Sequence, residues 1–200
     1  MTPRNFYRLM KDKQVALLFP GGVRESNHGK DEAYKLFWPD DRAEFVRVAA
    51  AFGADIVPFG AIGAADGVTI VRDKDEPLEL PPFLGGGRGR ARGGGPPSAR
   101  RWRNDTTEDF RFPLPLPNPA GPARFYFLFG EPVSTVDVDP KDRDACAAVY
   151  ERVKVDVAGS IEYLLEKRKS DPYERPVPRL LYERARAGAQ APTFELDSDA

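Results

Sequence analysis

The sequence predicts an α/β fold, and three observations support this prediction. Residues 15–19 form a continuous apolar run that is closed by Pro20, Gly21 and Gly22. Apolar residues then recur at helical spacing over residues 45–52, and a second short apolar run covers residues 56–59. The order strand, loop, helix, strand within about sixty residues is typical of α/β proteins.

In the first half of the chain, we expect a short amphipathic helix over residues 5–10, with Asn5 as its N-cap. The run at residues 15–19 predicts a strand buried on both faces, as in a parallel sheet. For the helix over residues 45–52, Asp40 or Asp41 is the expected N-cap, and Gly53 is the expected C-terminal glycine. Residues 56–59 predict a second strand, followed by a glycine-rich exit.

In the second half, the prolines of residues 112–119 favour extended, polyproline-like chain, and residues 124–129 predict a strand. The longest helix is expected over residues 142–169, with a bend or break near Gly159. Pro172, Pro176 and Pro178 are expected to end regular structure.

Glycine and proline are in excess, at 18 and 20 residues, and many of them lie between residues 85 and 119. The Gly/Arg-rich part cannot bury enough apolar surface to fold, so we expect a disordered insertion there. The expected organisation is a first domain part over residues 1–84, a low-complexity insertion over 85–111, a second domain part over 112–184 and a disordered tail over 185–200.

Composition excludes several classes of function. The net charge of −1 argues against binding nucleic acid through overall basicity, although the Arg/Gly segment leaves RNA binding open as a less favoured alternative. One cysteine, Cys146, and one histidine, His28, exclude a disulfide framework and a Cys/His zinc site, so we expect no metal and no cofactor. No apolar stretch is long enough to span a membrane. We expect Cys146 to be a buried small hydrophobe and His28 to be solvated in a polar loop.

Two segments are candidates for a binding site. Residues 19–25, with sequence Phe-Pro-Gly-Gly-Val-Arg-Glu, follow the first expected strand. Their glycines would let a ligand approach the backbone, but a plain tight turn is the alternative. Residues 56–63 would form the wall of an apolar pocket, or only a core strand with its turn.

Several blocks, taken in order, resemble the acyltransferase part of the plant phytyl ester synthases, which are plastid relatives of the second type of diacylglycerol acyltransferase. The blocks are residues 17–25, 34–39, 45–60, 124–132 and 171–173. The resemblance covers roughly residues 5–184, apart from the insertion. It implies part of a glycerolipid-acyltransferase-like domain, of the lysophospholipid-acyltransferase type, with a short mixed sheet flanked by helices.

The resemblance also implies a function: transfer of a fatty acyl group to a lipid alcohol, phytol or diacylglycerol. The donor would be acyl-CoA, acyl-carrier protein or a lipid, and the protein would act at a membrane or lipid-body surface without nucleic acid. The implied location is the plastid, with a membrane-associated cytoplasmic protein as the alternative. Gly21, Gly22 and Arg24 correspond to the family's acceptor-binding block, and Pro58 and Gly60 would line the acyl or acceptor pocket.

The sequence departs from the family in its catalytic motif. Such acyltransferases use a His-x4-Asp motif, in which histidine deprotonates the acceptor hydroxyl. The fifth residue after His28 is Ala33, so no catalytic residue is assigned. We therefore expect the C-terminal part of a longer enzyme or a truncated gene model, inactive by itself and lacking a first strand. The resulting exposed edge would make the chain poorly soluble. The alternative is a non-catalytic lipid-binding or interaction module.

Overall fold

The computed structural model describes residues 3–26, 28–39, 43–72, 114–119, 121 and 123–197, so the expected insertion at 85–111 lies outside the described residues. Helices and strands are both present, which confirms a mixed α/β character in general terms. The helices are α1 (Pro3–Lys11), α2 (Gly22–Ser26), α3 (Glu44–Phe52), α5 (Arg143–Arg168) and α6 (Pro176–Ala185), with a 3-10 turn at Ala65–Gly67. The strands are β1 (Phe59–Ile62), β2 (Val68–Arg72), β3 (Leu114–Pro117) and β4 (Tyr126–Phe129).

The described strands form two separate antiparallel pairs, β1 with β4 and β2 with β3, so the expectation of one mixed sheet is wrong. The strand expected at residues 15–19 does not form. Val15, Leu17 and Phe19 are exposed, and no backbone group of residues 15–18 bonds to another described residue. An apolar run indicates an extended chain, but it does not reveal whether the backbone finds a partner.

The second expected strand forms, but it is shifted along the chain. Ile56 only bridges to Val133, with two backbone hydrogen bonds of 2.9 and 2.8 Å, and the continuous strand begins at Phe59. Pro58 has no N–H to donate to a ladder. Residues 60–62 of the expected glycine-rich exit therefore belong to β1 itself, and Gly63 follows it.

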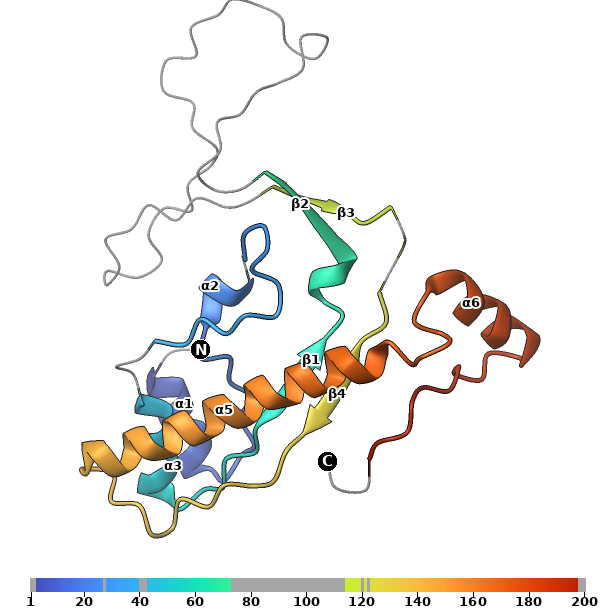
Figure 1. Ribbon diagram of the computed structural model, residues 1–200. Coiled ribbons are helices and arrows are strands. Elements are labelled where there is room, and N and C mark those ends of the chain that lie inside the picture. The colour runs from blue at the N-terminus through green and yellow to red at the C-terminus, as the bar shows by residue number, and fades with distance from the viewer. Residues whose placement is uncertain are drawn as a thin grey trace, which may run out of the picture.

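Helix α5 lies across the β1–β4 pair and covers one of its faces (Figure 1). The Asp142 side chain accepts hydrogen bonds from the Asp144 and Ala145 amides at its start, and the helix runs unbroken through Gly159, so the expected break is wrong. Its buried residues are Cys146, Tyr150, Val153, Val157, Ser160, Ile161 and Leu164. The opposite face of the pair carries the exposed rings of Phe127 and Phe129.

Helices α1 and α3 pack together at one end of α5, and the Tyr7 and Phe52 ring centroids are 4.8 Å apart (Figure 1). Both helices were expected, and Gly53 ends α3 in the left-handed conformation, with φ 58°. Their expected N-caps are wrong. Asn5 lies inside α1, and Ala43 precedes α3 without a side-chain cap, while Asp40 and Asp41 lie outside the described residues.

Prolines behave differently from the prediction at two places. Residues 114–117 are extended, as expected, but they pair with β2 as an edge strand, where Pro115 and Pro117 alternate with leucines. The expectation that Pro176 and Pro178 end regular structure is wrong, because α6 begins at Pro176. Proline is tolerated in the first helical turn, where its missing N–H would have no intrahelical partner.

Residues 186–197, which belong to the segment expected to be a tail, run back along the body. The Arg124 guanidinium donates to the carbonyls of Ala191 and Pro192 at 2.5 and 2.8 Å. It also pairs with the buried Asp171, at 3.1 Å, which accepts a further bond from the Tyr126 hydroxyl at 2.7 Å. Burial and this carboxylate raise the pKa of Tyr126, so its hydroxyl stays protonated. This part of the chain is therefore packed against β4.

A methyl group at Gly60 should separate β1 from α5. A Cβ there would lie 2.7 Å from the Ser160 Cβ and 3.0 Å from the Ile161 amide nitrogen. We expect Gly60→Ala to lower the free energy of unfolding by about 1–3 kcal/mol in urea titrations. The control Gly159→Ala, on the exposed side of α5 with open space around it, should raise that free energy by about 0.5–1 kcal/mol. Equal effects of both substitutions would contradict the close approach.

Candidate functional site

The turn after residues 15–19 leads directly into the short helix α2. Gly22 begins this helix with φ +53°. The Arg24 guanidinium forms two bonds to the Glu32 carboxylate, of 2.8 and 2.6 Å, and its central carbon lies 3.8 Å from the centroid of the Phe37 ring. The Arg24 side chain therefore connects α2, at the start of this loop, to Glu32 within it and to Phe37 at its end.

Gly21 leaves space for the side chain of Glu25. A Cβ at position 21 would lie 2.0 Å from the Glu25 Cδ, so any larger residue there displaces this side chain. Glu25 in turn accepts a hydrogen bond from the Phe37 amide through Oε1, at 2.9 Å. The glycine thus allows a carboxylate to fold back across the turn and hold the next segment of chain.

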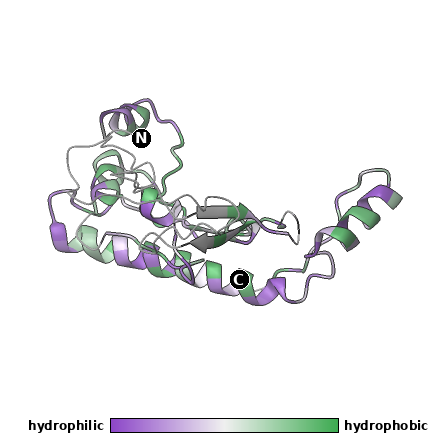
Figure 2. Ribbon diagram, turned by 90° about the horizontal axis from the view of Figure 1, so that it is seen from above, coloured by the Kyte–Doolittle hydropathy of each residue, from purple (hydrophilic) through white to green (hydrophobic). Residues whose placement is uncertain are grey.

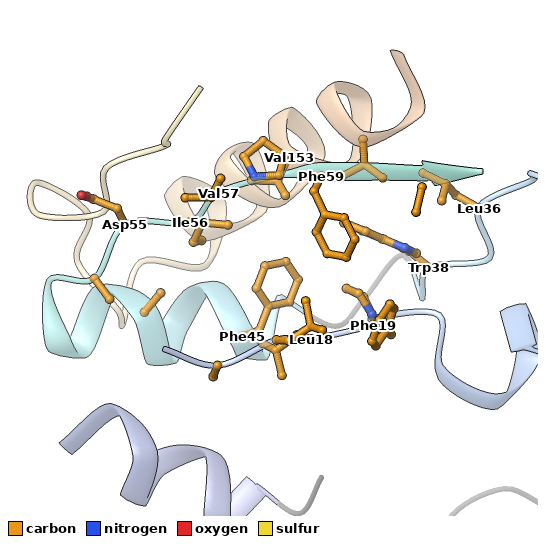
Figure 3. A pocket seen from close by; sticks show the side chains of 18 of the residues that line it. Leu18, Phe19, Leu36, Trp38, Phe45, Asp55, Ile56, Val57, Phe59 and Val153 are labelled. Carbon is orange, nitrogen blue, oxygen red and sulfur yellow. The ribbon is translucent and has the colours of Figure 1, made fainter. Parts of the chain in front are cut away.

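An apolar cavity of about 280 Å³ lies next to this turn. Its walls come from residues 16–20, from α1 and α3, from residues 54–59 and from Val153, Val157 and Ile161 of α5. Figure 3 shows the rings of Phe45, Phe59 and Trp38 converging on the space, while Asp55 lies at one end with its carboxylate directed outward. The centre of the cavity is lined by hydrocarbon side chains, which suits a ligand with an apolar chain.

The structure brings together only part of the site predicted from the sequence. Pro58 lines the cavity, whereas Gly21, Gly22 and Arg24 lie in the adjoining turn. Gly60 is buried against α5 and is not among the lining residues. Whether these five residues bind substrate stays a prediction.

Two lining residues were given no individual role from the sequence: Trp38, and Glu25 at the end of the candidate turn. Trp38 is buried, and its ring centroid is 5.6 Å from that of Tyr150 on α5. It belongs to a cluster of apolar residues at 36–38 that ends at Pro39, and such a cluster in a polar stretch is a signal for a buried contact. The available signal for Glu25 was its position four residues after Gly21. In a helical turn, residues four apart lie next to each other, so this spacing predicts that the Glu25 side chain lies against Gly21.

His28 and Cys146 show no catalytic arrangement within the described residues. His28 is half-buried, and its Nδ1 lies 3.2 Å from the Gly29 carbonyl oxygen, with no carboxylate partner among the described side chains. Cys146 is buried, as expected, and burial raises the pKa of its thiol. In the described part of the chain there is also no cluster of three His, Cys, Asp or Glu side chains that would hold a metal ion.

Comparison with known proteins gives two curated relatives from Arabidopsis thaliana. The chain is 40% identical over 195 residues to "Phytyl ester synthase 2, chloroplastic", covering 96% of this chain and 27% of that protein. It is 40% identical over 214 residues to "Phytyl ester synthase 1, chloroplastic", covering 98% of this chain and 28% of that protein. Over this shared segment, the chain belongs to the phytyl ester synthase family.

The chain thus spans less than a third of the length of these phytyl ester synthases, and the cavity lies within the shared segment. No protein-family profile and no solved structure matches the chain. No helix in the described ranges is both long and apolar enough to cross a membrane.

Filling the cavity should prevent an apolar chain from entering it. Val57 lines the cavity and is 47% exposed, so Val57→Phe adds volume without disrupting the core. We expect this variant to bind decane about tenfold more weakly, a loss of about 1.4 kcal/mol in binding free energy. Binding is measured by the fluorescence of Trp38 in a background in which the other tryptophan is removed by Trp102→Phe. Val155→Phe, at an exposed position of α5 outside the cavity, should bind as the parent does. If the two variants bind decane equally well, decane binds outside this cavity.

Proposed function

We propose that this chain is the substrate-chain-binding part of an O-acyltransferase that moves a fatty acyl group to a lipid alcohol. The observation that carries the proposal is the hydrocarbon-lined cavity beside the Phe-Pro-Gly-Gly turn. The names of the relatives support phytol as the acceptor and the plastid as the location, and diacylglycerol is the second acceptor. The acyl donor is acyl-CoA, acyl-carrier protein or a lipid.

The proposal assigns binding, and not proton transfer, to the residues of this chain. Acyl transfer to an alcohol needs a base that removes the hydroxyl proton. His28 is the single histidine, and the structure gives it no orienting carboxylate within the described residues. This observation also supports the second candidate function, a lipid-binding module without catalysis.

A chimera separates the two candidates. The matching segment of phytyl ester synthase 2 would be replaced by this chain, and ester formation from acyl-CoA and phytol would be measured. An acyltransferase segment should retain ester formation, and adding Val57→Phe should lower kcat/KM by about tenfold, a loss of about 1.4 kcal/mol. A folded chimera that binds decane but forms no ester would support the binding module. The 200-residue chain alone should give no turnover above a heat-inactivated control.

We also propose that the chain contacts an anionic lipid surface through α6. Figure 1 shows this helix projecting from the end of the molecule, and none of its residues is buried. Val177, Leu180 and Leu181 are exposed at the i, i+3, i+4 spacing that places side chains on one face, and hydrophobic and hydrophilic positions alternate around the helix in Figure 2. Arginines at positions 175, 179, 184 and 186 complement anionic headgroups.

Removing the apolar face of α6 should release the chain from vesicles. Replacing Leu180 and Leu181 with serine is expected to lower partitioning onto phosphatidylglycerol vesicles by about tenfold or more, because two exposed leucines lose their burial in lipid. Leu196→Ser, at a similarly exposed position outside α6, is the control and should partition as the wild type does. Unchanged sedimentation of the double variant with vesicles would exclude α6 as the contact.

A further inference from the structure

A second cavity, of about 440 Å³, adjoins the apolar one. The two cavities share the lining residues Glu25, Leu36, Ala61 and Ile161. The two cavities are therefore neighbours, and these four shared residues mark the junction between them. Polar side chains, including those of His28, Tyr34 and Lys35, line the second cavity only.

Glu25 is the only charged side chain that lines both cavities, considering the described residues. Its Oε1 accepts the Phe37 amide at 2.9 Å, and its side chain is held in the space that Gly21 leaves open. Its Oε2 accepts no hydrogen bond from any described residue. One carboxylate oxygen is therefore fixed, and the other, which lies 2.4 Å from the position of a Cβ at Gly21, remains an acceptor on a residue that borders both cavities.

The remaining polar groups of the second cavity differ in what they offer a ligand. The Tyr34 hydroxyl is already used, because it donates to Asp66 and accepts from the Gly63 amide at 3.0 Å. Lys35 is exposed and forms no ion pair with a described residue, so water screens its charge. Glu25 is less exposed than Lys35 and lies where the apolar walls begin, so its carboxylate has the stronger effect on a ligand at the junction.

We propose that the two cavities form one binding site for a long-chain alcohol, with the alkyl chain in the apolar cavity and the hydroxyl donating to Glu25 Oε2. This inference rests on the proposed function and assigns its acceptor to this site. The hydroxyl of an alcohol donates a hydrogen bond, which a carboxylate oxygen can accept. The negative charge of the carboxylate strengthens this hydrogen bond. The carboxylate of a fatty acid at the same point would face a like charge in partly desolvated surroundings.

The test compares decanol with decanoate, using Trp38 fluorescence in the Trp102→Phe background at pH 8. Wild-type protein should bind decanol at least tenfold more tightly than decanoate, a difference of about 1.4 kcal/mol. Glu25→Gln keeps an oxygen for the Phe37 amide but removes the charge, so the preference should fall to about threefold or less. Equal binding of the two ligands by wild-type protein, or an unchanged preference in Glu25→Gln, would overturn the assignment.

Two further variants control for indirect effects. Gly21→Ala pushes the Glu25 side chain out of its position while leaving its charge in the protein, and it should reduce the preference as Glu25→Gln does. Glu166→Gln removes the same charge from an exposed position paired with Lys169 and should keep the wild-type preference. Loss of the preference in Glu166→Gln would show that overall charge causes it and would also overturn the assignment.

Decane separates this inference from the proposed function. If decane and decanol bind but decanoate binds equally well, the apolar cavity holds a chain and only the role of Glu25 is wrong. If decane does not bind to wild-type protein, the apolar cavity is not a chain-binding site, and the proposed function loses its support together with this inference.

Discussion

The close approach of β1 to α5 is the constraint on which the remaining structure depends. It requires glycine at position 60, because the strand backbone lies against Ser160 and the Ile161 amide. The helix residues that this contact brings inward, Val153, Val157 and Ile161, are core residues and also walls of the apolar cavity. The core and the apolar cavity therefore use the same face of α5, and a change in the strand-to-helix spacing would alter both.

A network of polar contacts around α2 positions the other wall. Glu32 accepts from Arg24 and also from the Gly29 amide, at 2.6 Å, while Glu25 accepts from the Phe37 amide. These bonds connect the glycine-rich turn to the segment that carries Trp38. A cavity lined mainly by hydrocarbon thus owes its shape to charged residues at its edge, since apolar contacts alone do not fix the direction of a chain.

The elements predicted correctly are those whose signals are local. The helical spacing of residues 45–52, the left-handed glycine that follows them and the long helix α5 are each encoded by patterns within a short stretch of chain. Pairing depends on partners far away in the sequence. Ile56 meets Val133 and β2 meets β3 across long separations, so neither the antiparallel arrangement nor the unpaired state of residues 15–18 follows from composition.

The same distinction applies to the site. The turn at residues 19–25 was identified because glycine, proline and arginine stand together, and Pro58 was identified from its neighbouring strand. Trp38 and Glu25 become site residues only through contacts with chain far from them or on the other side of a turn. Gly60 is expected to line a pocket but is instead required for packing. A glycine in a strand permits the close approach of either a ligand or another part of the backbone, and the sequence does not distinguish the two.

The unpaired backbone of residues 15–18 has a consequence for access to the apolar cavity. This segment forms one wall, yet no ladder of hydrogen bonds to the described residues must break before it moves. Its opening free energy is consequently small compared with that of global unfolding, and its amide protons should exchange at rates near those of a free loop. Such a wall can shift without breaking the contacts of β1 with α5 on the other side of the cavity, so the proposed acyl or alkyl chain would have its way in at residues 15–18.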